Sequence, residues 1–403
     1  MRDRELIRGA RQLTGRLCDG RGTACGGRVP AWGGRRAWWR LGVTVAALVG
    51  VWASVQLGCA VPGKKEAQRG VFPAAEEQAL GLELVWPLPL RSKSPVKDIY
   101  RLPGTLCVVN TDNTFVAIDP EKGNPLWTQY LDDTVRLRAT EAGDKLYLVL
   151  GARLLTLDKA TAASQERRLD FVASSPPAVD SLYVYLGAAG GRLRALNLGP
   201  RIGWQQTVGS TIMGRPQVDT AGVYFASNNG RVYAVNVADG TRKWEFQTDR
   251  AVVADLVLQR NVLYVGSRDG RLYALDTALA GSRKQQQRWL LPYSSGGDIQ
   301  KTPLVRGDAI FVVDEQTGVH AVRADDGTGL WRCPQADSFI ATAGDRVFLG
   351  VGGRQVLCLD RETGKVLWER RLPAKFLFVA NGEDDLIYFC RERDGCVYCY
   401  RAR

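Results

Sequence analysis

The sequence predicts an all-β fold, an eight-bladed β-propeller built from four-stranded antiparallel blades. The first observation is a pattern that recurs eight times after residue 100. Each copy begins with a polar turn and an alternating strand that ends in a small residue. An Asp or Asn usually follows, then a second turn and, in most copies, a Trp. The clearest copies are NTFVAIDPEKGNPLW (113–127), GRVYAVNVADGTRKWEF (230–246), GVHAVRADDGTGLW (318–331) and RQVLCLDRETGKVLW (354–368). Repeats of this kind are stable only when neighbouring units bury their faces against each other.

The second observation is the period of the repeat. The residues two positions after the small strand residue are Asp119, Asp158, Asn197, Asn236, Asp276, Arg323, Asp360 and Arg401. They lie 39, 39, 39, 40, 47, 37 and 41 residues apart, which fits a four-stranded blade of roughly 40–50 residues. A helical repeat is excluded because the segments alternate with period two and are interrupted by Gly and Asn turns.

The N-terminal segment, residues 1–58, is predicted to be an export signal or a membrane anchor. Residues 1–40 carry ten arginines and three acidic residues, and residues 41–58 carry no charge. A basic region followed by an apolar core is typical of an export signal. The alternative is an uncleaved membrane span, for which eighteen residues are barely long enough.

The end of this segment has two features that bear on export. VQLGC (55–59) resembles a lipobox, although Gln56 stands where that motif has an aliphatic residue, so Cys59 is a lipidation candidate. Arg35-Arg36 resembles the twin-arginine signal, which leaves the export route open. On either route the arginines stay cytoplasmic and the propeller lies outside, at the cell envelope. Residues 59–81 are expected to be a polar tether.

Residues 82–403 are predicted to form the propeller, which the N-terminal strand closes. The last copy, GCVYCYRAR (395–403), ends after its third strand, whereas a lone Trp strand, GLELVWPLPL (81–90), precedes the first complete copy. Together they make one blade, and pairing them removes two exposed sheet edges.

Each blade is expected to dock on its neighbour through a Trp in its fourth strand. The predicted docking residues are Trp86, Trp127, Trp204, Trp244, Trp289, Trp331 and Trp368, with a degenerate position near Arg168. A buried indole offers a large apolar surface and an N–H for a neighbouring carbonyl. The alternative interpretation, a cage of rings around a ligand, is less consistent with this regular placement.

The pattern Ala-x-Asp…Gly-x-x-x-Trp resembles the repeat of the pyrroloquinoline-quinone-like propellers over residues 82–403. Within that family, a single eight-bladed domain behind a lipoprotein-like leader is similar to the B-subunit lipoproteins of the outer-membrane barrel-assembly machinery. This resemblance implies a non-enzymatic scaffold that binds a protein partner on the periplasmic side of the cell envelope. The alternatives are a propeller that binds a small molecule or a glycan, and a degenerate quinoprotein that binds quinone.

Catalytic, cofactor-binding and metal-binding residues are not expected. His320 is the only histidine, and no nucleophile elbow accompanies it. The quinoprotein dehydrogenases that share this fold are longer, bind calcium beside the quinone, and many have adjacent cysteines, which this chain lacks. Of the net charge of +12, the leader contributes +7, so the propeller is too weakly basic to indicate nucleic-acid binding.

Cys390 and Cys399 are predicted to form a disulfide. If Asp394-Gly395 is a two-residue turn, the two cysteines face each other across the final hairpin at a non-hydrogen-bonded pair, where Cα atoms approach to about 4.5 Å. The alternative is a pair of reduced cysteines that fill a blade interface. Cys396 and Cys399 do not indicate a metal site. Successive residues of a strand point to opposite faces of the sheet, so two residues three positions apart also point to opposite faces.

The longest interval contains an insertion, residues 277–298, which carries Arg283, Lys284 and Arg288. Insertions in a repeat array map to loops on one face, often the binding face. This segment is therefore the candidate partner loop, with an idle solvated loop as the alternative.

Overall fold

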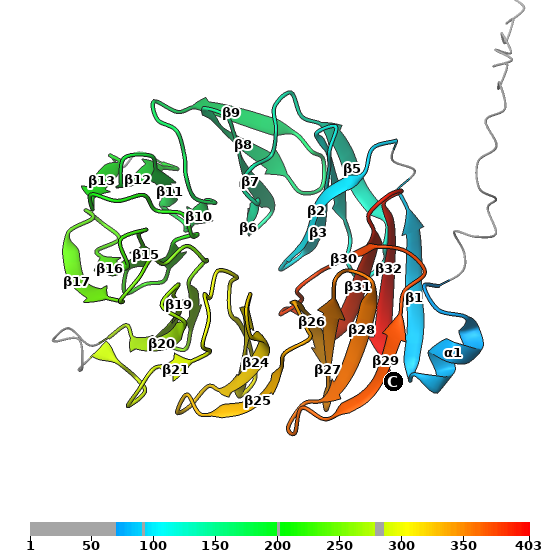
Figure 1. The fold of residues 1–403 in the computed structure, drawn as a ribbon. Helices are drawn as coiled ribbons and strands as arrows, with labels where there is room; N and C mark the ends of the chain where they lie inside the picture. The colour runs from blue at the N-terminus through cyan, green and yellow to red at the C-terminus, as the bar shows by residue number, and fades with distance from the viewer. Residues whose placement is uncertain (1–69, 91–92, 200–201, 279–285) are drawn as a thin grey trace, which may run out of the picture. The chain divides into compact units, whose positions relative to one another are not determined.

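The fold is an eight-bladed ring. A computed structural model describes residues 70–90, 93–199, 202–278 and 286–403. Its strands form eight separate four-stranded antiparallel sheets around a common centre (Figure 1). The predicted all-β, eight-bladed propeller is therefore confirmed. The predicted export segment 1–58, the lipidation candidate Cys59 and the loop residues Arg283 and Lys284 lie outside the described residues.

The blades are numbered in chain order, and the strands of each follow from the centre outward. Blade 1 consists of β2 (Val96–Leu102), β3 (Thr105–Asn110), β4 (Thr114–Ile118) and β5 (Pro125–Tyr130), and blade 2 consists of β6 (Thr140–Ala142), β7 (Lys145–Leu150), β8 (Arg153–Asp158) and β9 (Ser164–Arg168). Blade 3 consists of β10 (Ala178–Val179), β11 (Tyr183–Ala188), β12 (Arg192–Asn197) and β13 (Trp204–Thr207), and blade 4 consists of β14 (Gln217–Val218), β15 (Val223–Ala226), β16 (Arg231–Val235) and β17 (Arg242–Gln247).

Blades 5 to 8 complete the ring. Blade 5 consists of β18 (Val257–Gln259), β19 (Val262–Gly266), β20 (Arg271–Asp276) and β21 (Tyr293–Ser294), and blade 6 consists of β22 (Leu304–Arg306), β23 (Ala309–Asp314), β24 (Gly318–Arg323) and β25 (Gly329–Cys333). Blade 7 consists of β26 (Ser338–Ala343), β27 (Arg346–Val351), β28 (Gln355–Asp360) and β29 (Val366–Arg371), and blade 8 consists of β30 (Phe376–Phe378), β31 (Leu386–Arg391), β32 (Cys396–Ala402) and β1 (Leu82–Pro89).

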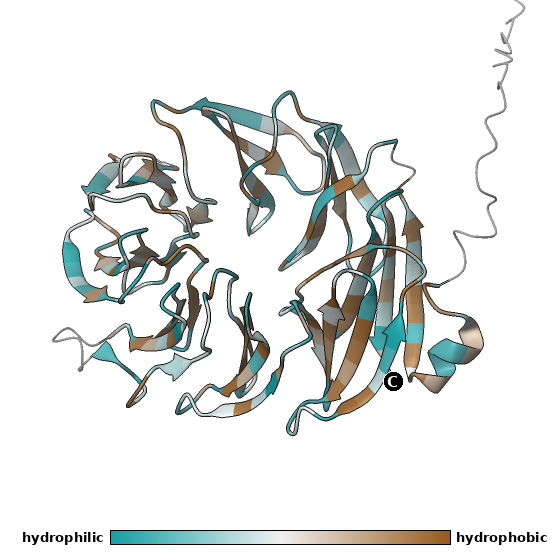
Figure 2. Ribbon diagram, in the orientation of Figure 1, coloured by the Kyte–Doolittle hydropathy of each residue, from teal (hydrophilic) through white to brown (hydrophobic). Residues whose placement is uncertain are grey.

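The hydrophobic core lies between the blades. The second strands are almost continuously buried, as in β3 and β11, because both of their faces meet a neighbouring sheet. The outer strands face solvent on at least one side, and all five residues of β9 are exposed. Figure 2 shows this gradient as hydrophilic colour on β9 and β17 at the rim. Burial between sheets, repeated around the ring, supplies the main stabilisation.

The ring closes as the sequence predicts. β1 pairs antiparallel with β32, with Leu82 opposite Ala402 and Pro89 opposite Cys396. The last blade therefore has the order β1-β32-β31-β30, in which its outermost strand comes from the N-terminal side of the domain. Figure 1 shows β1 running beside β32. β1 and β32, which are about 310 residues apart in the sequence, thus share one sheet. Their pairing covers a sheet edge that each would otherwise expose.

Residues 70–81 correct the expectation of a polar tether through residue 81. They include a short helix, α1 (Ala74–Ala79), and they pack against the last two blades. The backbone N–H of Val71 donates to the Tyr400 hydroxyl (2.5 Å), which in turn donates to Glu77 Oε1 (2.7 Å). The buried ring of Phe72 lies 6.3 Å from that of Phe389. We define residues 70–81 as the strap, because they bind the closing strand to the ring.

Trp docking joins neighbouring blades. In five seams the indole N–H of one blade donates to a backbone carbonyl in the turn between the third and fourth strands of the next. The bonds are Trp86 to Pro120 (3.1 Å), Trp127 to Lys159 (2.9 Å), Trp204 to Val237 (2.9 Å), Trp289 to Ala324 (2.9 Å) and Trp331 to Arg361 (2.7 Å). Each acceptor lies one or two residues after the end of a third strand.

Glycine in the receiving turn makes room for the ring. A Cβ added at Gly240 would lie 2.3 Å from the Trp204 ring, and one added at Gly364 would lie 2.4 Å from Trp331. Gly240 has φ +73° and Gly364 has φ +68°. Both the left-handed backbone and the close approach therefore require glycine. A turn glycine lies against the ring in four of the five seams, whereas Ala162 (φ +60°) holds this position in the blade 2 turn that receives Trp127.

Two tryptophans depart from this arrangement. Trp244 is buried, but its N–H has no acceptor among the described residues. Its neighbour is blade 5, where the insertion replaces the usual short turn. Trp368 faces blade 8. The third and fourth strands of that blade, β32 and β1, come from opposite ends of the domain sequence, so no turn joins them. It packs 5.9 Å from the Phe348 ring.

Replacing Gly240 with Ala tests the docking contact. We expect the free energy of unfolding to fall by roughly 2–5 kcal/mol, because the methyl group combines left-handed strain with a clash against Trp204. Gly209→Ala is the matched control, since Gly209 has φ +75° with nothing near its Cβ position. The control should lose only about 1–2 kcal/mol. Equal losses in chemical denaturation would contradict the docking account.

Removing residues 59–90 tests closure of the ring. The truncated domain should expose the edge of β32 and lose the strap, so its melting temperature should fall by roughly 10 °C or more. Self-association should rise with concentration in light scattering. A monomer that melts at the temperature of the intact domain would show that β1 is dispensable.

Candidate functional site

Charged side chains link the inner ends of the blades. On the central side of the ring, Asp98 of blade 1 receives two hydrogen bonds from the guanidinium of Arg138 on blade 2, at 2.8 and 2.9 Å. The same guanidinium lies 5.2 Å from the Tyr100 ring centroid. Two-point Arg–carboxylate pairs are directional as well as strong. This pair fixes the relative position of two inner strands.

A second arginine extends the network to blades 4 and 5. The Arg215 guanidinium donates to the Ala139 carbonyl of blade 2 (3.2 Å), and its backbone N–H donates to Asp255 of blade 5 (2.7 Å). Burial lowers the pKa of the Arg138 guanidinium, but the Asp98 hydrogen bonds and the charges of Asp98 and Asp255 outweigh it and raise that pKa. Charged residues of blades 1, 2, 4 and 5 thus form one network at the inner rim.

Arginines also cross the opposite side of the ring. Arg306 of blade 6 donates to the Gly382 carbonyl (3.1 Å) and to Asp385 (2.5 Å), both in blade 8. Arg101 of blade 1, whose side chain is 5% exposed, pairs with Asp384 at 3.1 Å. These contacts span neighbouring or next-but-one blades. They brace the inner rim rather than leave its carboxylates available to a ligand.

The donor set does not fit a calcium-bound quinone. Within the described residues, no group of three His, Cys, Asp or Glu side chains could hold a metal ion. Carboxylates of the inner rim, such as Asp98 and Asp384, are already paired with guanidinium groups. An oxygen-rich calcium site needs several carboxylate or carbonyl ligands together.

His320 is held as a structural residue. It is 2% exposed, with the Tyr293 hydroxyl 2.8 Å from Nδ1 and the Thr317 hydroxyl 2.7 Å from Nε2. Burial lowers the pKa of the imidazole despite the charge of Asp314, which raises it. With both ring nitrogens engaged by hydroxyl groups of its own blade and the preceding one, the imidazole bridges two blades.

The predicted register of the last hairpin is wrong by two residues. Cys390 lies opposite Val397, and Cys399 lies opposite Tyr388. The loop holds four residues rather than two, closed by a hydrogen bond from the Gly395 N–H to the Arg391 carbonyl (2.9 Å). Diagonal neighbours on a sheet are about 7–8 Å apart, which is too far for the usual disulfide.

The cysteines of the last hairpin are free. Cys390 and Cys399 belong to one buried cluster, and neither is bonded to another cysteine. Burial raises the pKa of both thiols, so the thiolate is suppressed at neutral pH. The structure therefore supports the alternative that reduced cysteines fill a blade interface.

The described part of the insertion carries exposed apolar residues that the sequence did not single out. Arg288 lies 3.8 Å from Asp276 with 58% of its side chain exposed. Trp289 is buried, but the next two residues, Leu290 and Leu291, are 93% and 73% exposed. Blades 1, 3, 4, 6 and 7 carry a polar residue directly after the Trp, which is the signal that sequence inspection could have used.

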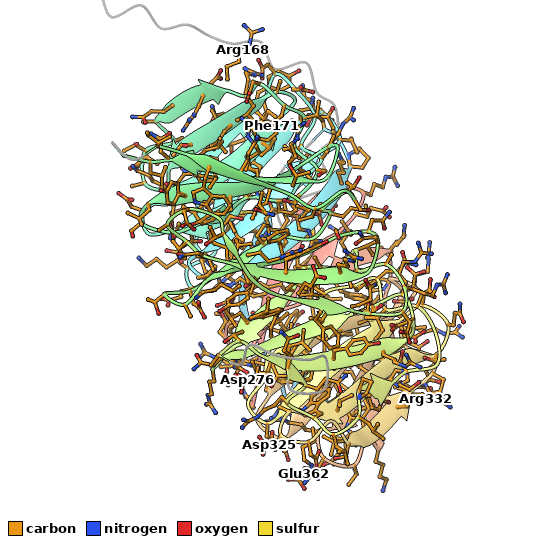
Figure 3. All side chains as sticks on the ribbon, turned by 90° about the vertical axis from the view of Figure 1, so that its left-hand side faces the viewer. Arg168, Phe171, Asp276, Asp325, Arg332 and Glu362 are labelled. Atoms are coloured by element: carbon orange, nitrogen blue, oxygen red, sulfur yellow. The ribbon has the colours of Figure 1, made fainter. Side chains whose placement is uncertain are left out.

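The sequence also predicts a degenerate docking position near Arg168 in blade 2, which lacks a Trp. Arg168 is exposed at the end of β9, where Figure 3 shows it pointing away from the rim. It pairs with Arg153 rather than with the small residue of the third strand. Gln165 lies opposite Thr156 and holds the Trp position. The degenerate docking position is therefore Gln165, not Arg168.

Eight blades with Trp docking define a propeller of the pyrroloquinoline-quinone repeat class. The family described as "Outer membrane protein assembly factor BamB" matches residues 162–331 and 315–402. These matches together span more than half of the chain, and the chain belongs to this family. No helix among the described residues is long and apolar enough to cross a membrane.

Solved structures share the fold. BamB from Moraxella catarrhalis is 17% identical, with a TM-score of 0.63, and the match covers 79% of this chain and 97% of that one. The quinohemoprotein alcohol dehydrogenase ADHIIG from Pseudomonas putida HK5 is 13% identical, with a TM-score of 0.60, covering 80% of this chain and 76% of the enzyme. Relatives of the same fold thus include an assembly factor and an enzyme.

A curated enzyme matches over a short stretch. Quinohemoprotein alcohol dehydrogenase ADH IIB from Pseudomonas putida is 27% identical over 103 residues. The match covers 22% of this chain and 15% of the enzyme. It extends the repeat similarity to the enzymes without spanning their full length.

The hairpin cysteines give a direct chemical test. Cys390 and Cys399 should resist alkylation by iodoacetamide in the native protein at pH 8, because burial keeps both thiols protonated. Both should react fully after unfolding without reductant. Peptide mapping decides the outcome, and a peptide joining the two cysteines would contradict the observed register.

Proposed function

We propose that this chain is a non-enzymatic, exported propeller that acts as a protein-interaction scaffold at the cell envelope. The family match supports a role in the assembly of outer-membrane proteins. The observation that carries the proposal is the inner rim, where arginines pair with the carboxylates of neighbouring blades. A ligand at the centre would have to break these pairs, whereas the outer strands and loops remain accessible.

Attachment to the membrane through the N-terminal segment belongs to the same proposal. An exported chain with a lipidated Cys59, or with residues 41–58 retained as an anchor, would hold the propeller at the periplasmic face. The strap then sets where the tether reaches the ring, because Gly70 lies against Tyr400 on blade 8.

The second candidate is a quinone-binding propeller, which the similarity to quinohemoprotein dehydrogenases favours. Two experiments separate the candidates. Capture from detergent-solubilised membranes should recover outer-membrane β-barrel proteins or subunits that assemble them, identified by mass spectrometry. Pyrroloquinoline quinone with calcium should leave the melting temperature unchanged. A quinone-dependent rise in that temperature, without capture of such proteins, would contradict the scaffold.

The insertion is the proposed partner loop, and its charge offers a test. Reversing Arg283 and Lys284 to Glu should weaken capture of the identified partner at least tenfold, because rim charges steer association. The melting temperature should not change. We leave residues from Gln286 onward intact, because Gln286 is fully buried.

Lys365→Glu with Arg371→Glu is the control for this loop variant. These exposed residues lie in the turn and outer strand of blade 7, so the pair makes the same charge change far from the insertion in sequence. Equal weakening by both double variants would indicate a general charge effect and would remove the insertion from the proposed interface.

A further inference from the structure

The seam between blades 2 and 3 lacks its docking ring. In blade 1 the small residue Ala117 lies opposite Trp127, and blades 3, 4 and 6 have the same Ala–Trp pair. In blade 2 the pair is Thr156 and Gln165. The indole that elsewhere rests on the next blade is absent here.

The substitution of Gln for Trp explains the difference, not the length of the preceding turn. Trp127 follows Asp119 by eight residues, whereas Gln165 follows Asp158 by seven. The docked Trp204 of blade 3 also follows Asn197 by seven residues. The pairing of β4 with β5 is shifted by a bulge beside Trp127, whereas β8 pairs with β9, and β12 with β13, without a shift. Gln165 still points toward blade 3, because the next pair on that side includes Leu154, which packs in the cluster shared by blades 2 and 3.

Arg167 provides the polar link across this seam. Its guanidinium donates to the backbone carbonyl of Asn197 (2.8 Å) and to the side-chain oxygen of the same residue (3.2 Å). These bonds replace the indole N–H but bring no ring. The apolar volume of the docking contact is therefore left unfilled at this seam.

A cavity of about 490 Å³ lies on blade 3 at this position. It is lined by Arg167, Arg194, Ala195, Leu196, Asn197, Gly203, Trp204 and Gln205. Its volume falls in the roughly 300–1,000 Å³ range of ligand sites. Leu198 (44% exposed) and Ile202 (91% exposed) are the sequence neighbours of the lining residues Asn197 and Gly203.

The cavity carries an excess of positive charge. Arg194 is held by Asp170, at 3.0 and 3.1 Å, and lies 4.8 Å from the Phe171 ring centroid. A hydrogen bond from Arg194 and the charge of Arg167 lower the pKa of Asp170, which keeps it ionised. Two guanidinium groups thus face one carboxylate that is 74% exposed. Guanidinium groups bind carboxylates by two-point contacts and stack on aromatic rings.

We propose that the seam between blades 2 and 3 is a docking slot for an aromatic side chain carried on an acidic segment of a partner protein. The ring takes the position that Trp occupies at the other seams, and flanking carboxylates pair with Arg167 and Arg194. The inference rests on the proposed scaffold function and assigns it a contact chemistry. An acidic partner is favoured over a basic one because the cavity-lining residues include two arginines and no acid.

Short peptides test the slot on the intact exported domain. The probe is fluorescein-labelled Asp-Glu-Trp-Glu-Asp, measured by fluorescence anisotropy at low salt. The same peptide with Ala in place of Trp, and Lys-Lys-Trp-Lys-Lys, are the comparison peptides. The acidic Trp peptide should bind at least tenfold more tightly than either. Equal binding of all three peptides would overturn the proposal.

Filling the slot from within provides the decisive variant. Gln165→Trp should supply the missing ring, raise the melting temperature and weaken binding of the acidic Trp peptide at least tenfold. Thr128→Trp, which adds an exposed Trp to the outer strand of blade 1, should leave binding unchanged. Arg167→Glu should also lose at least tenfold, which keeps the proposal testable if Gln165→Trp folds poorly. Wild-type binding by both slot variants would refute the slot.

Failure of the slot can be told apart from failure of the scaffold. Peptide binding requires no membrane partner, whereas capture of outer-membrane proteins does not depend on the probe peptide. If the peptide does not bind and capture still occurs, the slot is wrong and the scaffold stands.

Discussion

The contact between an indole and the glycine turn of the next blade sets the architecture. The repeat encodes both halves of this contact, because most copies carry both a turn that can receive a ring and a Trp that docks on the following blade. Gly327 lies against Trp289, and Trp331 of the same repeat donates to Arg361 of the next blade. A blade therefore has no complete set of contacts until it has a neighbour on both sides. This dependence favours a closed ring, in which β1 and β32 supply the last blade from two ends of the domain.

Features that depend on the period could be predicted from the sequence, and features that depend on a one- or two-residue offset could not. The eight blades and the closing strand follow from the repeat and from its unequal ends. The register around Cys390 failed because a Gly after Asp fits loops of several lengths, and the loop here has four residues. The docking position of blade 2 was misplaced at Arg168 because no Trp marks it, and the strand pairing places it at Gln165.

Contacts between distant segments were beyond sequence reasoning for a different reason. The Arg215 contact with Ala139 joins residues 76 positions apart, and no local pattern marks either one. The strap was missed because Val71 and Phe72 are two apolar residues in a polar stretch. Their burial depends on Tyr400 and Phe389, which only the closed ring brings nearby.

The blades differ from the common repeat mainly at the outer surface of the ring. Salt bridges brace the inner rim, whereas the insertion of blade 5 and the missing ring of blade 2 change the outer surface. In an array of similar blades, these departures give individual positions a distinct chemistry. A scaffold needs such positions in order to bind one partner in one orientation. The same argument disfavours the centre as a binding site, because its carboxylates are already paired with arginines.

Hydrogen exchange at matched amides tests the docking account most directly. In four blades the amide directly after the third strand makes the same kind of backbone hydrogen bond, at 2.8 Å for Lys159, Arg361 and Leu198 and 2.9 Å for Thr277. Lys159 and Arg361 receive an indole, whereas Leu198 faces the seam without a Trp and Thr277 is next to the undocked Trp244. The account predicts slower exchange at Lys159 and Arg361 than at Leu198 and Thr277. Equal protection at all four amides would contradict it.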